Sequence, residues 1–458
     1  MSEQNEEGER KPTVEELLAK ARKPGEDALK LHPFYQGKIE VTLKAPVRSF
    51  DDFAIWYTPG VAESCKVVHE DVEQSYVQTN RWNTIAVVSD GTRVLGLGDI
   101  GPEAGLPVME GKSLLFKYLG GVDAFPLCLA TKDPEEIIQC CKWLEPSLGG
   151  INLEDISQPK CFHILDTLRK EMNIPVWHDD QQGTATISVA AAINSLKFVG
   201  KKWDKALFCM VGAGAANIAT ARVLVAAGVP IGNIIMSDSK GILHQGRKDI
   251  EERKDEFKEK WKICLESNAE GRTGGIPDAM KDTDICIAAS KPGPGTIRPE
   301  WVSSMADDPV IFPEANPIPE IWPWEAKEAG AVIVATGRSD FPNQVNNSLG
   351  FPGIFRGTLD VSARTITDEM CIAAAFELAK TAEDNGIHAD YVVPTMDEWE
   401  VFPREATAVA LKAIEQGVAR KKMSRQEIFE KAEHVIRRAR EQTKTMMANE
   451  LFIPPAPE

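Results

Sequence analysis

The sequence predicts an α/β protein made of two successive α/β units followed by helices. Three observations predict this fold class. Between residues 80 and 200, short apolar runs typical of strands alternate with longer stretches typical of helices. The same alternation resumes at about residue 204, and after residue 366 the pattern becomes helical. Such alternation favours parallel sheets with helices covering their faces.

Composition excludes several classes of protein. The 458 residues suggest two or three domains, and the net charge of -17 argues against a nucleic-acid partner or an anionic membrane. The sequence contains no apolar stretch near the ~20 residues that span a bilayer. Nine cysteines without a CxxC pair, and a polar, acidic start (MSEQNEEGERK) unlike a signal peptide, predict a cytoplasmic protein.

The first unit contains strand and helix patterns in strict succession. The run IAVVSDGTRVLGL (85–97) has Asp90-Gly91 between two β-rich segments, which predicts a hairpin. Further strands are expected in DAFPLCLA (123–130), GGINLEDI (149–156) and IPVWHDD (174–180). Helices are expected in GKSLLFKYL (111–119), DPEEIIQCCKWL (133–144), CFHILDTLRKEM (161–172) and TATISVAAAINSLKFV (184–199).

Two of these strands end in paired acids. Glu154-Asp155 follows one, and Asp179-Asp180 follows another. The carboxyl ends of parallel strands share one edge of a sheet, so neighbouring strands would bring the four carboxylates together. Their repulsion would be relieved by a hard divalent ion with oxygen ligands, Mg²⁺ or Mn²⁺. The alternative is that Asp155 and Asp180 cap the helices that follow.

The second unit opens with a glycine-rich turn. GAGAAN (212–217) follows a strand and begins a helix, and Asp238 ends the next strand. This context predicts a Rossmann-type doubly wound domain with a dinucleotide pyrophosphate at the helix N-terminus. Asn217 stands where the usual pattern has a third glycine, and a turn without any ligand is the alternative. The predicted cofactor-binding residues are Gly212, Gly214, Ala215, Asn217, Asp238, Ser239 and Lys240.

Several long motifs occur in an order that resembles one family. They are YTPGVA (57–62), SDGTRVLGLGDIG (89–101), GLPVMEGK (105–112), GGINLEDI (149–156), HDDQQGTA (178–185), GAGAAN (212–217), EANP (314–317), TGRSDFPNQVNN (336–347) and FPGIFRG (351–357). Over roughly residues 30–440 the chain resembles the malic enzymes, in their shorter prokaryote-like form. The resemblance implies oxidative decarboxylation of (S)-malate to pyruvate and CO₂ with reduction of NAD(P)⁺, and also decarboxylation of oxaloacetate.

The resemblance also implies a role for individual residues. It implies that the metal ligands are Glu154, Asp155 and Asp180. Lys112 would be the general base, oriented by Asp179, and Tyr57 would be the general acid. The substrate-binding residues would be Arg93, Asn316 and Asn347, with Asn316 also near the nicotinamide. By residue type alone, Tyr57 is an aromatic with its hydroxyl in water and Lys112 a solvated lysine. A base near neutral pH requires a lowered lysine pKa, which desolvation and a dication would provide.

The resemblance implies four segments and an oligomer. They are an acidic extension (1–30), a substrate and metal domain (31–181), the nucleotide domain with C-terminal helices (182–440) and a tail (441–458). The family suggests homodimers or larger assemblies, and some members complete the active site across subunits. Two alternatives stay open: a malolactic enzyme that converts malate to lactate, and a non-catalytic nucleotide-sensing protein.

Cofactor preference rests on the residues after the second strand of the nucleotide domain. Asp238 is placed to accept a ribose 2′-hydroxyl, which favours NAD⁺. Ser239 and Lys240 could hold a 2′-phosphate, with Arg247 and Lys248 on the adjoining segment. The sequence thus predicts use of both cofactors with a modest NADP⁺ preference, unless Ser239-Lys240-Gly241 is only a solvated turn.

Overall fold

A computed structural model describes residues 14–452 and 455. Its first sheet is parallel, with the strand order β2-β1-β3-β4. The strands are β1 (Thr84–Ser89), β2 (Asp123–Cys128), β3 (Gly150–Leu153) and β4 (Val176–His178). Because β3 and β4 are neighbours, the acid pairs that follow them lie at the same edge of the sheet.

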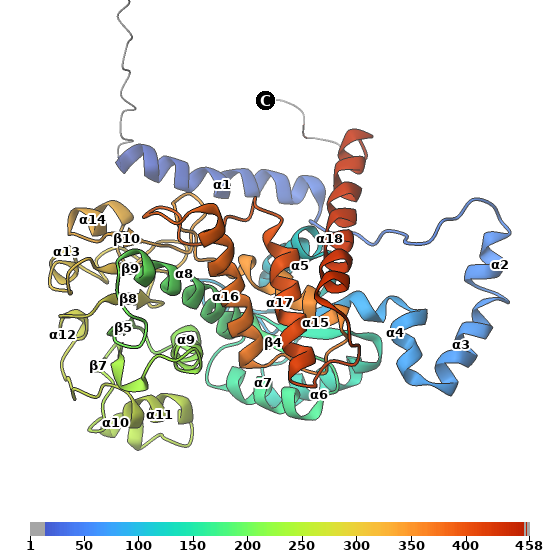
Figure 1. The fold of residues 1–458 in the computed structure, drawn as a ribbon. Helices are drawn as coiled ribbons and strands as arrows, with labels where there is room; N and C mark the ends of the chain where they lie inside the picture. Colours follow the sequence, from blue (N-terminus) through green and yellow to red (C-terminus); the bar gives the residue numbers. More distant parts are fainter. Residues whose placement is uncertain (1–13, 453–454, 456–458) are drawn as a thin grey trace, which may run out of the picture.

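Helices cover both faces of this sheet. Alternate residues of β1 point to opposite faces: Ile85 and Val87 pack on one side, Ala86 and Val88 on the other. The first side is covered by α5 (Pro102–Gly120), α15 (Phe351–Asp360), α17 (Val401–Glu415) and the start of α18 (Arg425–Ala448). The second side is covered by α6 (Pro134–Leu144) and α7 (Lys160–Glu171). The C-terminal helices therefore help to build the first unit (Figure 1).

The second sheet has the order β10-β9-β8-β5-β6-β7, in which only β7 is antiparallel to its neighbour. Its strands are β5 (Phe208–Val211), β6 (Ile234–Asp238), β7 (Gly241–Ile242), β8 (Ile285–Ala288), β9 (Val310–Pro313) and β10 (Ile333–Val334). One face packs against α8 (Thr184–Phe198), α9 (Ala215–Ala226), α11 (Lys258–Glu266) and α16 (Asp368–Asn385). The other packs against α12 (Ile276–Met280), α13 (Pro299–Val302) and α14 (Pro323–Glu328). The arrangement is a doubly wound Rossmann-type domain, as predicted.

The hairpin predicted around Asp90-Gly91 is absent from the described chain. After β1 the backbone forms a compact loop with an isolated antiparallel bridge between Val94 and Gly98. Asp90 is buried and accepts hydrogen bonds from the amide (3.1 Å) and the hydroxyl (2.6 Å) of Thr92, while Lys160 also binds its carboxylate. These side-chain contacts turn the chain away from β1, so β1 pairs in parallel with β2 and β3 instead.

The described N-terminal region packs differently from the rest. Helix α1 (Val14–Tyr35) runs along one side of the molecule, and α4 (Ser75–Gln78) joins the first unit (Figure 1). Between them, α2 (Asp52–Trp56) and α3 (Val61–Glu70) project from the body and contain no buried residue. We call residues 36–78 the N-terminal arm. Among the described residues, no helix is long and apolar enough to cross a membrane.

Candidate active site

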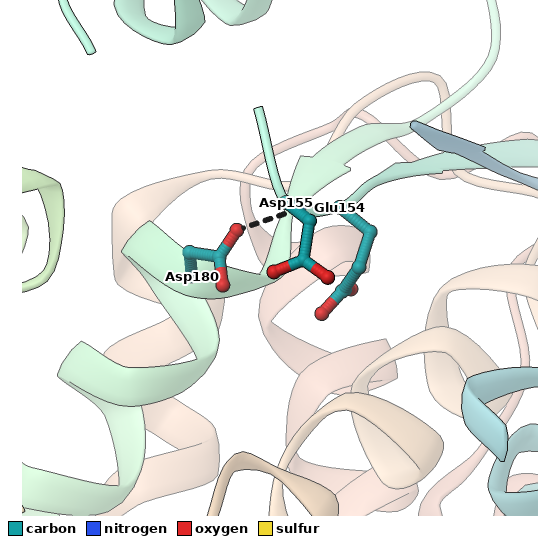
Figure 2. Close-up of side chains that lie close together, drawn as sticks. All are labelled: Glu154, Asp155 and Asp180. Atoms are coloured by element: carbon teal, nitrogen blue, oxygen red, sulfur yellow. Dashed lines mark hydrogen bonds between the residues drawn. The ribbon is translucent and has the colours of Figure 1, made fainter. Parts of the chain in front are cut away.

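Three carboxylates gather where β3 and β4 end. Glu154 and Asp155 directly follow β3, and Asp180 lies in a π-helical turn (Asp179–Gly183) after β4. One oxygen from each of Glu154, Asp155 and Asp180 lies within 4.8 Å of the others, and we call these three residues the acid cluster (Figure 2). The backbone amide of Asp155 donates to Asp180 Oδ2 at 2.9 Å, which ties the two strand ends together.

The acid cluster does not cap helices. The N-cap of α7 is Pro159 and that of α8 is Gly183, so neither aspartate occupies a capping position. Asp155 has a left-handed backbone conformation (φ 53°), which is costly for a non-glycine residue and is typical of functional sites. Its Oδ2 is buried and has no hydrogen-bond partner among the described residues. The cluster therefore presents a buried oxygen atom, Asp155 Oδ2, that the described protein groups leave unsatisfied.

The electrostatics of the acid cluster favour binding of a cation. Burial and the charge of Asp180 raise the pKa of Asp155 to about 8. Burial also raises the pKa of Glu154 well above its usual value, although Lys112 opposes this. Because the carboxylates repel one another in a poorly solvated place, a divalent cation bound to all three would stabilise their ionised forms. The donor set, carboxylate oxygens alone, suits Mg²⁺ or Mn²⁺.

Lys112 reaches this cluster from α5. Only 8% of the residue is exposed, and its Nζ lies 2.6 Å from Asp179 Oδ2 and 3.1 Å from Glu154 Oε1. Burial lowers the pKa of Lys112, but the two carboxylates outweigh burial and raise it above the usual value. The lowered pKa expected from the sequence depends on a bound dication, whose charge would oppose that of the carboxylates around Lys112, and it stays a prediction.

Asp179 holds Lys112 from a fixed position. Asp179 is completely buried, and the indole Nε1 of Trp177 donates to its Oδ1 at 3.1 Å. A side chain at Gly183 would place its Cβ 2.2 Å from that same oxygen, so only glycine fits there. On the other side, Lys112 Nζ lies 4.4 Å from the centre of the Phe351 ring. These contacts leave Lys112 little freedom to change its conformation.

The predicted substrate-binding residues lie near the loops that follow β1, β3 and β4. The Arg93 backbone amide donates to the Asp155 carbonyl at 3.0 Å, and the Arg93 side chain is exposed. Asn347 Cβ lies 3.1 Å from the position that a Cβ on Gly183 would take. Asn316 follows β9, and its carbonyl oxygen would lie 2.7 Å from a Cβ on Gly96, in the loop that carries Arg93.

Tyr57 lies apart from these residues. It ends α2 in the N-terminal arm, and 72% of the residue is exposed. In the described part of the chain, no hydrogen bond joins the Tyr57 side chain to Lys112 or the acid cluster. The structure of one chain thus does not bring together the two residues expected to transfer protons.

The glycine-rich turn after β5, the predicted pyrophosphate site, leaves open space at the start of α9. Gly212 has a positive φ (102°), and a Cβ there would lie 2.5 Å from the Ala289 carbonyl. Gly214 caps α9, and a Cβ there would meet nothing within 4 Å, so the helix N-terminus at Ala215 is open. Asn217 replaces the third glycine without disturbing the turn, because its Nδ2 donates to the carbonyls of Val211 and Gly212.

Asp238 is engaged with basic side chains. Both of its oxygens accept from Arg247 (3.0 and 2.9 Å), and Lys260 Nζ lies 2.6 Å from Oδ2. These hydrogen bonds outweigh burial and lower the pKa of Asp238. Lys240 donates its backbone amide to Asp238, while its Nζ pairs with Asp249 at 3.1 Å. Ser239 is exposed.

Sequence reasoning missed two residues beside the acid cluster and one in the nucleotide domain. His178 and Gln181 are completely buried, and neither the ring nitrogens nor the amide atoms have a hydrogen-bond partner among the described residues, although His178 Nδ1 lies 3.7 Å from Asp180 Oδ2. Glu320, also buried, contacts the loop before Asn316. The signal for His178 and Gln181 was their place within HDDQQG; no motif indicated Glu320.

Comparison with known proteins agrees with this geometry. Residues 36–169 match the family described as "Malic enzyme, N-terminal domain", and residues 181–416 match "Malic enzyme, NAD binding domain". The chain belongs to the malic enzyme family. Both the fold class and the enzyme class expected from the sequence are thereby confirmed.

Individual relatives are similar over most of this chain. A bifunctional malic/malolactic enzyme of Bacillus subtilis is 49% identical, over 89% of this chain and 97% of its own. An NAD-dependent malic enzyme of Geobacillus stearothermophilus is 48% identical, over 84% of this chain and 78% of its own. An NADP-dependent malic enzyme of Haemophilus influenzae is 45% identical, over 86% of this chain and 53% of its own. The crystal structure of Entamoeba histolytica malic enzyme has a TM-score of 0.94 and 46% sequence identity, and the match covers 96% of this chain and 93% of that one.

Proposed function

We propose that this chain oxidises (S)-malate to pyruvate and CO₂ with reduction of NAD(P)⁺, that it requires a divalent metal ion, and that it also decarboxylates oxaloacetate. The observation that carries the proposal is the buried Lys112, held by Asp179 beside the acid cluster. Once a bound cation offsets the charge of the carboxylates, a buried amine in this position is suited to removing a proton from a hydroxyl group.

Glu154, Asp155 and Asp180 would hold the metal ion, and the unpartnered Asp155 Oδ2 supports this assignment. When bound, a divalent cation would polarise the oxygen atoms of malate as a Lewis acid and offset the negative charge that raises the pKa of Lys112. Lys112 would take the proton of the malate hydroxyl, and Asp179 would keep the amine aimed at it.

The remaining residues would bind and orient the substrate and the cofactor. Arg93, exposed beside Asp155, would pair with a malate carboxylate. Asn316 and Asn347 would hydrogen-bond malate near the nicotinamide. The open N-terminus of α9 would bind the pyrophosphate.

The decisive assay is malate-dependent formation of NAD(P)H with and without Mn²⁺. We expect formation with Mn²⁺ and none after chelation. A malolactic reaction is the second candidate, because the Bacillus subtilis relative carries both names. If malate turnover yielded lactate and no net NAD(P)H, the result would favour the malolactic reaction. A nucleotide-sensing protein has no need of Lys112 against the acid cluster, and binding of NAD(P)⁺ without any malate turnover would identify one.

We propose that the protein is a homodimer or a larger homo-oligomer. The N-terminal arm exposes apolar side chains that a second copy would cover, among them Phe50 (87% exposed) and Ile55 (60%). The same contact would bring Tyr57 to the active site of the partner, where it could act as general acid. A cytoplasmic location is consistent with nine free cysteines.

For the cofactor we propose use of both NAD⁺ and NADP⁺ with NAD⁺ preferred, against the NADP⁺ preference expected from the sequence. Lys240 and Arg247 are already paired with carboxylates. Lys260 is likewise paired, with Asp238 itself. A 2′-phosphate placed there would have to compete with these carboxylates for the basic side chains, whereas a 2′-hydroxyl could donate a hydrogen bond to Asp238.

A further inference from the structure

Glu320 is a completely buried glutamate that binds two loops at the edge of the nucleotide sheet. Its Oε1 accepts hydrogen bonds from the amide (2.8 Å) and the hydroxyl (2.9 Å) of Ser290, and its Oε2 accepts from the Ala315 amide at 3.0 Å. Ser290 follows β8 and Ala315 follows β9, so one carboxylate joins the ends of two adjacent strands.

Each of these loops contacts a different part of the active site. A Cβ on Gly212, in the pyrophosphate turn, would lie 2.5 Å from the Ala289 carbonyl and 3.1 Å from Ser290 Cβ. A Cβ on Gly96, in the loop of Arg93, would lie 2.7 Å from the Asn316 carbonyl. The two loops joined by Glu320 therefore connect the pyrophosphate turn with the loop that carries Arg93.

The carboxylate suits this task only in its ionised form. Three donors point at two oxygens, and charge-assisted hydrogen bonds are stronger than neutral ones. Burial raises the pKa of Glu320 to about 7, although the amides of Ala315 and Ser290 oppose the rise. The titratable groups that face it are Glu314, whose own pKa burial raises to about 8, and the buried thiol of Cys286.

We propose that Glu320 is a positioning residue, which fixes the nicotinamide half of the cofactor site by holding the loops of Ser290 and Ala315 together. The proposal rests on the proposed function, because Asn316, next to Ala315, is there assigned to the nicotinamide end. The pyrophosphate turn also keeps hydrogen bonds of its own, from Asn217 to the carbonyls of Val211 and Gly212, so the adenosine half, which binds at α9 and Asp238, should be affected less.

The test is a comparison of two ligands in Glu320→Gln. A glutamine side chain keeps one acceptor oxygen and replaces the other with a donor, so one loop amide loses its partner. We expect NAD⁺ to bind about tenfold more weakly than to the wild type, ~1.4 kcal/mol. ADP-ribose, which lacks the nicotinamide, should lose clearly less affinity than NAD⁺. Affinities are measured by titration calorimetry without malate.

Two further variants keep the test decisive. Glu325→Gln is the control, because Glu325 accepts a hydrogen bond from the amide of Trp322, the N-cap of α14, and among the described residues no hydrogen bond joins its side chain to either loop. Ser290→Ala removes only the hydroxyl bond and should weaken NAD⁺ binding in the same direction by about threefold, a readout that remains if Glu320→Gln fails to fold. Unchanged NAD⁺ binding, or equal loss of NAD⁺ and ADP-ribose, would overturn the proposal. A wild type that binds NAD⁺ but lacks malate turnover would refute the proposed function alone.

A pH series adds a second readout. Wild-type affinity for NAD⁺, relative to ADP-ribose, should increase as the pH rises from 6 to 8 and Glu320 ionises. Glu320→Gln should show no such increase. The same slope in both proteins would assign the pH dependence to Glu314 or Cys286 and contradict the role of Glu320.

Discussion

The acid cluster with Lys112 and the N-terminal arm are each expected to supply one proton-transfer group, but their packing is opposite. Lys112 is 8% exposed, and two carboxylates fix its amine. Tyr57 is 72% exposed, in a segment whose helices α2 and α3 bury no residue. One chain by itself organises the groups around Lys112, whereas the chemistry proposed for Tyr57 would require a surface that one chain does not provide.

Because of this difference, we expect activity to depend on charge at the acid cluster and on association of subunits at the N-terminal arm. Substitutions around the acid cluster should act through charge, because burial leaves each carboxylate dependent on a nearby cation. Substitutions in the arm should act through association, because exposed apolar side chains gain stability only when another surface covers them. The following experiments measure each dependence separately.

The largest effect is expected from loss of a metal ligand. Asp180→Ala should reduce malate turnover to background, and modest Mn²⁺ should not restore it, because two carboxylates bind a dication more weakly than three. Asp204→Ala is the control, since Asp204 is exposed and pairs only with Lys205. Mn²⁺ titrations of both variants provide the measurement. Full wild-type activity in EDTA after dialysis would refute the metal requirement.

A second large effect concerns the proposed base. Lys112→Ala should lower kcat for malate oxidation by about 10²- to 10⁴-fold, the usual contribution of a general base. Small amines should restore part of the rate by entering the space left beside Asp179. Lys142→Ala is the matched control, because Lys142 forms an ion pair with Glu171 in solvent. Turnover close to that of the wild type would mean that another group removes the proton.

The role of the arm can be tested by mixing inactive variants. Tyr57→Phe should impair protonation of enolpyruvate more than hydride transfer, so that reduction of oxaloacetate partly survives. If Tyr57 acts in the partner's site, co-expression of Tyr57→Phe with Lys112→Ala should restore about a quarter of wild-type activity, from random pairing in a dimer. Lys112→Ala with Asp180→Ala should restore none. Equal failure of both mixtures would place Tyr57 and Lys112 in the same chain's site.

The sequence predicted the site well where strand order determines contacts. Acids at the ends of β3 and β4 meet because adjacent parallel strands end at one edge. Helix-capping, the open alternative, failed because a π-helical turn separates Asp180 from the start of α8. The glycine turn also followed from local pattern, with Asn217 closing it by hydrogen bonds to two carbonyls.

Features that depend on long-range packing could not be predicted. The expected hairpin after Asp90 does not form, because Lys160, far along the chain, binds Asp90 and fixes the loop. Asp179 and Glu154 raise the pKa of Lys112, and this effect is not visible in the sequence because the two carboxylates approach Lys112 only after folding. Glu320 carries no motif, since its role is visible only when two loops converge on it.

A smaller effect is expected on stability, and it follows from the burial of two glutamates in the nucleotide domain. Burial raises the pKa of Glu314 to about 8 and that of Glu320 to about 7, so between pH 5 and 8 the folded state binds more protons than the unfolded state. The free energy of unfolding should therefore decrease as the pH rises through this range. Thermal unfolding of the metal-free protein measures this. Glu314→Gln should flatten the slope, and an unchanged slope would contradict the assignment.

The smallest effect is expected at Lys240. If an unpaired lysine contacted the 2′-phosphate, removing it would lower kcat/KM for NADP⁺ about tenfold, ~1.4 kcal/mol. Lys240 Nζ is exposed and pairs with Asp249. We therefore expect Lys240→Ala to lower kcat/KM for NADP⁺ about threefold or less and to leave kcat/KM for NAD⁺ unchanged. Lys248→Ala removes the same charge nearby and is the control. A tenfold loss confined to NADP⁺ would show that Lys240 leaves Asp249 for the phosphate, and would restore the NADP⁺ preference expected from the sequence.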